Sequence, residues 1–354
     1  RKAVNFFSVP DGHRIWARRA RKTADAIVVR HGIQVVLTSS APYSAHLIGM
    51  YLQKKHPGLG WVADFRDPMS THRGLVTIRR PPGWLGALRA CERRILEAAD
   101  RVIPNTPMNR RELMRLFGLP GGKATAIPNG YDPEMLPEPG VRRGQSGKLE
   151  LFYIGGLRGD WFEGPFYEAL AILKQQAPDL AGLLSVNFVG ADAIIGSKAE
   201  DLCVAEDIRM HGFVGQEAVG EFYTQAEAFL LILPSHDTAL GWVPQKLYAY
   251  LHCRKPVLAV VPEGQVADYV RRSESGVVVS PADSEEIAKA LRDMLETFAR
   301  EGRLDLTRSQ QAEEFVGTLS KPHLASEMLK MFRQLVDDKT SGFPGPGSSD
   351  PICG

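Results

Sequence analysis

Apolar residues recur along the chain in two alternating patterns, short β-branched runs and longer segments with helical spacing. In the first part of the chain, the helical spacing predicts helices at 13–30, 43–55, 85–98 and 106–116. The runs between them predict strands at 33–38, 61–65, 100–104 and 124–127. Strands and helices that alternate in this way are typical of βαβ units, so we expect a parallel sheet.

The same alternation returns after a break. Residues 133–148 combine Pro, Gly and charge without periodicity, which predicts an exposed linker and a domain boundary near residue 145. Beyond it, the pattern predicts strands at 149–154, 184–189, 207–211, 228–233, 256–260 and 276–279, and helices at 165–176, 216–225, 244–252, 265–271 and 284–300. We therefore expect an α/β protein with two Rossmann-like domains at 1–145 and 146–319, a last helix at 320–337 and a disordered tail at 338–354.

Length and composition limit the class of protein. A chain of 354 residues is long enough for two globular domains, and its longest apolar runs are far short of the roughly 20 residues that a spanning helix needs. Its four cysteines, at 91, 203, 253 and 353, are scattered and lack the spacing of metal ligands. These features predict a cytoplasmic protein without a structural metal. Because residue 1 is Arg and no apolar signal region follows, we expect a fragment that lacks its natural amino terminus.

The net charge of +2 conceals two halves of opposite sign. Residues 1–140 hold 22 Lys and Arg against 11 Asp and Glu, and the remainder holds 21 against 30. Basic residues of the first half, namely Arg14, Arg18, Arg19, Arg21, Lys22, Arg79, Arg80, Arg93 and Arg94, could bind anionic lipid headgroups at a membrane surface, or an anionic acceptor. The alternative is an ordinary solvated surface. No nucleic-acid motif accompanies the charge, so nucleic acid is not predicted as a partner.

The stretch 239–260 is the main candidate for an anion site. It predicts a turn, a helix from Pro244 and a buried strand, and the start of such a helix presents free N–H groups to phosphate. The amides would come from Leu240, Gly241, Trp242 and Val243, and the cations from Arg158 and Lys246. Gly156 would let the backbone approach a ligand closely, and Arg158 offers a forked, permanent charge. The alternative is a surface Arg beside an ordinary turn.

The first domain has its own candidates at strand ends. Arg66 and Asp67 follow the strand 61–65, where parallel sheets bind ligands, and Ser39 and Ser40 follow the strand 33–38. These four residues are candidate ligand contacts, whereas Asp64 is expected to pair with a basic neighbour. Two plainer interpretations remain open, an internal Arg–Asp ion pair that braces the loop and hydroxyls that only cap the next helix.

Five stretches in this order resemble one family. They are TSSAP at 38–42, WVADFRDP at 61–68, IPNGYD at 127–132, YIGGLR at 153–158 and the stretch 239–260. The set is similar to the retaining glycosyltransferases of the large family 4, in the subgroup with Asp-Phe-Arg-Asp. That resemblance implies the GT-B fold of two facing Rossmann-like domains, the first incomplete here. It also implies a nucleotide-diphosphate-sugar donor, a glycan, lipid-linked or other hydroxyl acceptor, retention of configuration, and no metal or other cofactor.

The resemblance implies that Arg66 and Asp67 are catalytic residues beside the sugar or the acceptor, and that Ser39 and Ser40 contact the acceptor. It also implies roles for residues near the nucleoside. His211 and Phe213 would border the nucleobase, although a His beside a Gly is more often structural. The family often has a pair of Glu where this chain has Gly241 and Ala249, the second of which bonds the ribose, and a Lys where it has Glu163. These departures keep open a weak or inactive GT-B module that binds nucleotide or glycan, or serves as a partner subunit. An epimerase of the same fold is a third interpretation. His236 and Asp237 follow the strand 228–233, but no third ligand or nucleophile accompanies them.

Overall fold

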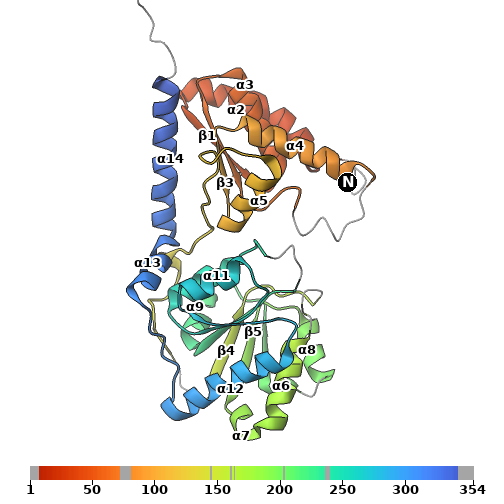
Figure 1. Ribbon diagram of the computed structural model, residues 1–354, viewed down its shortest axis with the longest axis vertical. Helices are drawn as coiled ribbons and strands as arrows, with labels where there is room; N and C mark the ends of the chain where they lie inside the picture. The colour runs from red at the N-terminus through yellow and green to blue at the C-terminus, as the bar shows by residue number, and fades with distance from the viewer. Residues whose placement is uncertain are drawn as a thin grey trace, which may run out of the picture. The chain divides into compact units, whose positions relative to one another are not determined.

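The computed structural model describes residues 8–71, 81–143, 146–159, 162, 164–201, 204–235 and 240–341. The chain forms two compact units, each with its own parallel sheet (Figure 1). Unit 1 comprises Arg1–Ile127 and Ala325–Gly354, and unit 2 comprises Pro128–Leu324. The α/β class and the two Rossmann-like domains predicted from the sequence are therefore confirmed.

Unit 1 contains a three-stranded parallel sheet in the order β1–β2–β3. Its strands are β1 (Val35–Ser40), β2 (Gly60–Phe65) and β3 (Arg101–Pro104), and its helices are α2 (Arg14–His31), η1 (Tyr43–Ala45), α3 (His46–Lys55), α4 (Trp84–Ala98) and α5 (Pro107–Phe117). Every residue of β2 is buried. This burial explains why the strand is mainly apolar and does not alternate, with Asp64 as its one charged residue.

The strand predicted at 124–127 forms only a single bridge, between Val102 and Ala124. The segment still runs beside β3, because the Val102 amide donates to the Lys123 carbonyl at 2.9 Å and the Ile127 amide donates to the Pro104 carbonyl at 3.0 Å. The next rung of a parallel ladder would need an N–H from residue 104. Proline has none, so the regular ladder ends there.

Unit 2 contains a six-stranded parallel sheet in the order β6–β5–β4–β7–β8–β9. Its strands are β4 (Leu149–Ile154), β5 (Leu184–Val189), β6 (Ile208–Gly212), β7 (Ala228–Ile232), β8 (Val257–Val260) and β9 (Gly276–Val279). If the six strands are numbered 1 to 6 along the chain, their order in the sheet is 3-2-1-4-5-6, as in nucleotide-binding sheets. In such sheets the connections run in opposite directions from the first and fourth strands, which here are β4 and β7.

Most helices of unit 2 lie where the sequence predicts them. They are α6 (Pro165–Gln176), α9 (Gln216–Gln225), α10 (Gln245–Cys253), α11 (Gln265–Arg272) and α12 (Ser284–Glu301). The sequence analysis did not predict α7 (Pro178–Ala181), α8 (Ala193–Asp201) and α13 (Gln310–Thr318), nor the short turns η3 (Pro133–Met135) and η4 (Ala205–Asp207). All five of these missed elements are short, with nine residues or fewer.

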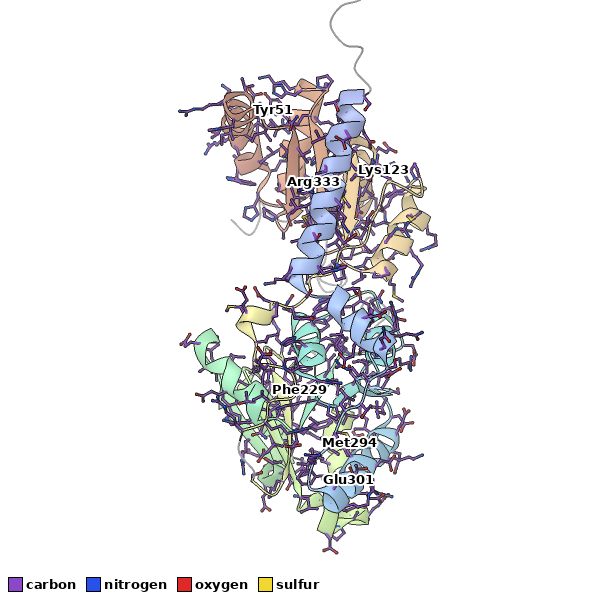
Figure 2. All side chains as sticks on the ribbon, turned by 90° about the vertical axis from the view of Figure 1, so that its left-hand side faces the viewer. Tyr51, Lys123, Phe229, Met294, Glu301 and Arg333 are labelled. Atoms are coloured by element: carbon purple, nitrogen blue, oxygen red, sulfur yellow. The ribbon has the colours of Figure 1, made fainter. Side chains whose placement is uncertain are left out.

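Aromatic side chains fill the unit 2 core. Phe229 of β7 stacks on Tyr250 of α10 with ring centroids 4.3 Å apart and the rings 4° from parallel. The Tyr250 hydroxyl accepts from the Ile154 amide at 2.7 Å. Phe229 lies inside this unit (Figure 2). Buried aromatic area of this kind contributes strongly to stability, and the hydroxyl bond fixes α10 against the end of β4.

The predicted linker belongs to unit 2. The Tyr131 amide donates to the Leu319 carbonyl at 3.0 Å, Gly140 N to Cys253 O at 2.9 Å and Arg143 N to Thr224 O at 3.0 Å. Because these backbone groups are bonded within unit 2, the division falls between Ile127 and Pro128 and not near residue 145.

The last helix, α14 (Lys321–Ser341), extends beyond the predicted 320–337. Disorder from residue 338 was expected, but 338–341 are helical, since Asp338 pairs with Arg101 at 2.9 Å and Lys339 with Asp100 at 2.8 Å. Residues 342–354 lie outside the described residues. None of the described helices is both long enough and apolar enough to span a bilayer.

A buried lysine closes the end of α9. Lys255 is 1% exposed, and its Nζ donates to the carbonyls of Tyr223 at 2.7 Å, Thr224 at 3.0 Å and Ala226 at 2.5 Å. Carbonyls at the end of a helix have no partners within it, so the ammonium group satisfies three acceptors that the fold otherwise buries.

We predict that Lys255→Met lowers the free energy of unfolding by about 3 kcal/mol, because buried acceptors lose their donor. Urea denaturation followed by circular dichroism measures the change. Lys289→Met, at an exposed position of α12, is the matched control and should change stability by about 0.5 kcal/mol or less. Equal stability of the two variants would contradict the capping role.

Candidate functional site

The carboxyl ends of β4 and β7 define the candidate site of unit 2, because ligands of such sheets bind where the connections diverge. Gly155 follows β4 with a φ of 112°, a conformation that favours glycine. Its amide donates to the Val189 carbonyl at 2.8 Å. A Cβ at Gly190 would lie 3.4 Å from the Gly155 carbonyl carbon, so the two loops pass in van der Waals contact.

Lys246 reaches this loop from the first turn of α10. Its Nζ lies 3.5 Å from the ring centroid of Tyr153 and donates to the Gly156 carbonyl at 3.3 Å. A Cβ at Gly155 would lie 3.1 Å from Lys246 Cε, so the stem of the lysine passes directly over that glycine. Burial lowers the Lys246 pKa to about 7. Within the described parts of the chain no carboxylate pairs with this ammonium group.

The segment before α10 is held by backbone contacts. The Leu240 carbonyl accepts from the Gln265 amide at 2.7 Å, and Val243 is 2% exposed. Pro244 precedes α10 with an extended backbone, and no side chain of a described residue caps the helix there. The amino end of α10 therefore carries its partial positive charge next to Lys246.

The structure brings some predicted donor residues together and separates others. Gly156 and Lys246 are in contact, whereas Arg158 is exposed two residues further along the loop. Leu157, between them, is 3% exposed, and its carbonyl accepts from the Asp192 amide at 2.9 Å. This anchor fixes the backbone from which Arg158 projects.

His211 takes part in a network on the face of the sheet. Its Nε2 lies 2.9 Å from Asn187 Oδ1, and Asn187 Nδ2 donates to Glu150 Oε2 at 2.7 Å. Its ring packs against Phe222 with centroids 5.0 Å apart, and burial lowers the pKa of the imidazole. These contacts favour the structural interpretation of His211.

The other two residues expected near the nucleoside differ sharply in exposure. Phe213 is 95% exposed directly beyond β6, so its ring is available for stacking. Ala249 is 9% exposed and lies on the core-facing side of α10. A hydrogen bond to a ribose cannot come from a buried methyl group.

In unit 1 the residues at the strand ends bond to one another. Arg66 Nε donates to Asp64 Oδ1 at 2.7 Å, and Ser39 Oγ donates to Asp64 Oδ2 at 2.8 Å. Ser40 Oγ lies 3.4 Å from the Asp64 carbonyl. The ion pair that was the alternative for this loop is therefore present, and its carboxylate is Asp64, which was expected to pair with a basic neighbour.

Asp67 is half-buried and lies near Tyr43. Burial raises the pKa of the Tyr43 hydroxyl, and the charge of Asp67 raises it further. That hydroxyl donates to the Pro68 carbonyl at 3.0 Å. The contact ties the loop after β2 to η1.

Sequence reasoning missed the support of this loop. Glu92 is 1% exposed on α4 and accepts from the amides of Met69 at 3.3 Å and Ser70 at 3.1 Å. The available signal was a single Glu between the buried Leu88 and Ile95, at helical spacing on an apolar face. Burial raises the pKa of this carboxyl, although the two amides oppose the shift.

Several earlier candidates lie outside the described residues, namely His236, Asp237, Glu163, Arg79 and Arg80. Among the residues that the structure does describe, no group of His, Cys, Asp and Glu has the arrangement of a metal site.

Two family profiles match the chain, one on each unit. Residues 150–297 match glycosyl transferases group 1, and residues 2–135 match glycosyltransferase family 4. Among curated proteins, D-inositol 3-phosphate glycosyltransferase of Thermobispora bispora is 25% identical over 248 residues, which are 66% of this chain and 56% of that protein. The chain thus spans a little over half the length of this relative.

Solved structures with the same fold cover more of the chain. Sucrose-phosphate synthase from Thermosynechococcus elongatus gives a TM-score of 0.65 at 18% identity, over 92% of this chain and 79% of that one. The pneumococcal O-GlcNAc transferase in complex with UDP and GlcNAc gives 0.57 at 11% identity, over 89% and 60%. Each of the two units thus matches a glycosyltransferase profile, of group 1 or of family 4, and the chain has the GT-B fold.

Proposed function

We propose that the chain transfers a sugar from a nucleotide-diphosphate-sugar to a hydroxyl acceptor, with retention of configuration and without a metal ion. The observation that carries the proposal is the position of Lys246, a desolvated cation over Gly155 at the divergence of the six-stranded sheet. An ammonium group that has lost water and found no carboxylate favours an anionic ligand.

The diphosphate would bind between the Gly155–Arg158 loop and the start of α10. The amides of Leu240, Gly241, Trp242 and Val243 would supply hydrogen-bond donors at the amino end of that helix. Arg158 and Lys246 would supply two positive charges. Groups fixed in this way stabilise negative charge as it develops on a departing diphosphate, which is the role that a metal ion has in other transferases.

The transfer breaks the bond between the anomeric carbon and the diphosphate oxygen and forms a bond from that carbon to the acceptor oxygen. With retention, the acceptor hydroxyl attacks on the face from which the diphosphate leaves. Its proton passes to the departing phosphate oxygen. Arg66 and Asp67 would contact the sugar or the acceptor, and Ser39 and Ser40 the acceptor. Because Arg66 is already held by Asp64, Asp67 is the more available carboxylate.

Exposure distinguishes the two residues expected to border the nucleobase. The exposed ring of Phe213 would stack on the base. His211 is bonded to Asn187 and would border the base without stacking on it. The pneumococcal transferase of the same fold is described with UDP, so uracil is the first base to test. The curated relative is named for an inositol phosphate acceptor, which makes a phosphorylated polyol a candidate beside glycan and lipid-linked acceptors. We also propose that the protein is cytoplasmic and that an anionic membrane surface is one of its partners.

A second candidate is a weak or inactive GT-B module that binds a nucleotide or a glycan. It is favoured by Gly241 and Ala249, which stand where the resembled family often has two Glu. A panel of UDP-, GDP- and dTDP-sugars distinguishes the two functions. Sugar release or transfer supports the enzyme, and tight nucleotide binding with no release from any donor supports the inactive module.

We predict that Arg158→Ala and Lys246→Ala each lower kcat/KM about 10²- to 10³-fold, because each removes a cation from the departing diphosphate. Steady-state kinetics with the preferred donor measures the loss, and circular dichroism checks the fold. Lys289→Ala on α12 is the matched control and should retain full activity. Unchanged rates in both site variants would overturn the proposed diphosphate site.

We predict that UDP binding takes up about one proton at pH 8 and almost none at pH 6. Free Lys246 has a pKa of about 7, so it is mostly neutral at pH 8, and a bound diphosphate raises that pKa. Affinity should accordingly weaken as the pH rises above 7. Titration calorimetry in buffers of different ionisation enthalpy counts the protons. Lys246→Ala should abolish the uptake, and uptake that persists in this variant would assign the proton to another group.

We predict that Asp67→Asn lowers kcat/KM about 10²-fold and leaves the Kd for UDP unchanged, since this carboxylate belongs to unit 1 and the nucleotide site to unit 2. Glu97→Gln, at an exposed position of α4, is the control of equal charge change. A parallel loss of UDP affinity in Asp67→Asn would argue against an acceptor-side role.

A further inference from the structure

A groove of about 750 Å³ lies in unit 1 among α2, α3 and α4. Four arginines line it, Arg14, Arg18 and Arg21 from α2 and Arg94 from α4. We call it the arginine groove. The three α2 residues share one face of that helix, since they are spaced by four and three positions. The floor is apolar and includes Leu47 and Met50 of α3 with Ala87 and Ala90 of α4.

The described residues do not compensate the charge of the arginine groove. Within the described part of the chain, no carboxylate lines the groove and no ion pair involves Arg14, Arg18 or Arg94. Arg21 donates to the Leu47 carbonyl at 3.4 Å and lies 5.3 Å from the ring centroid of Tyr51, which Figure 2 labels. Four guanidinium groups around one concavity repel each other, and an anion in the groove would relieve that repulsion.

The nearest carboxylates have other partners. Asp11 accepts from the amide of Ser44 at 3.0 Å and from its hydroxyl at 2.6 Å. Glu92 accepts from the two amides after β2 described above. Neither can turn toward the guanidinium groups without breaking bonds that hold unit 1 together. No other carboxylate of the described residues lines the groove, so an anionic ligand would supply the compensating charge.

The lining narrows the class of ligand. Guanidinium groups bind phosphate through two parallel hydrogen bonds, while Leu47 and Met50 offer nothing to a sugar phosphate or to a free nucleotide. Ile15 is 62% exposed at the edge of the groove, where it would contact hydrocarbon. A ligand with a phosphate and an adjoining hydrocarbon chain uses both halves of the lining.

We propose that the arginine groove binds an anionic glycerophospholipid at a membrane surface, with its phosphate among the arginines and its hydrocarbon chain against Leu47 and Met50. The groove is linked to the candidate acceptor residues through short contacts. Asp11, two residues from Val9 of the lining, bonds Ser44, and Tyr43 bonds the Pro68 carbonyl beside Asp67. The lipid site is thus within the same end of unit 1 as Asp67. It does not depend on the transfer reaction.

Vesicle flotation tests the proposal on the whole chain. Wild type should float with phosphatidylcholine vesicles that contain phosphatidylglycerol and remain behind with phosphatidylcholine alone. The triple variant Arg14→Gln/Arg18→Gln/Arg94→Gln should bind at least about tenfold more weakly. The matched control, Arg30→Gln/Arg111→Gln/Arg115→Gln, removes the same charge from exposed positions of unit 1 and should stay within about twofold of wild type.

Equal losses of vesicle binding in the two triple variants would show that only net charge matters, and would overturn the proposed lipid site in the arginine groove. Absence of flotation by wild type at low salt would also overturn that proposal. UDP binding should be the same in wild type and in the groove variant, because the nucleotide site lies in unit 2. A failure of the lipid site is thereby separated from a failure of the proposed transferase function.

A second readout uses Cys91, which is half-buried in the groove. In a Cys203→Ser/Cys353→Ser background, labelling of Cys91 by a thiol reagent should slow about tenfold in the presence of short-chain phosphatidylglycerol monomers. Inorganic phosphate and glycerol 3-phosphate at the same concentration should not protect it. Equal protection by inorganic phosphate would make the groove a soluble anion site and overturn the lipid assignment.

Discussion

Between β4 and β7 the connections of the six-stranded sheet run off in opposite directions, and the candidate donor site depends on that divergence. Because Gly155 has no side chain, Lys246 lies across the loop after β4, where its Nζ contacts the Tyr153 ring and the Gly156 carbonyl. The lysine is desolvated and has no counter-charge among the described residues, which is a cost that an anionic ligand removes.

Most of the fold was predictable because its central strands are buried on both faces. β4, β5 and β7 are completely buried, and such strands read as short, mainly apolar runs between helical patterns. The predictions failed where the deciding interaction is not periodic. Pro104 interrupts a ladder by lacking one N–H, and the bonds of Tyr131, Gly140 and Arg143 attach an apparently loose linker to unit 2. Neither effect is visible in a pattern of apolar and polar residues.

The site was predictable at the level of loops and less so at the level of side chains. A basic partner for Asp64 was expected from the sequence, and Arg66 supplies it. The bond from Ser39 to the same carboxylate was not expected, because it depends on side-chain direction. The burial of Ala249 and the bond between His211 and Asn187 are likewise properties of packing that spacing alone does not specify. Glu92 was overlooked because its partners are backbone amides of a loop 22 and 23 residues earlier.

Unit 2 is continuous from Pro128 to Leu324, while unit 1 is completed only by residues from Ala325 onward. On a ribosome, unit 2 therefore has all of its contacts before unit 1 does. The last helix supplies Leu335, which packs against Gly60 at the amino end of β2. A Cβ at Gly60 would lie 2.9 Å from Leu335 Cγ, so the glycine leaves the space that Leu335 fills. These two residues are about 275 positions apart in the sequence. Until Leu335 is synthesised, the surface that it covers at Gly60 stays exposed. The folding of unit 1 can therefore be completed only after the rest of the chain has been made.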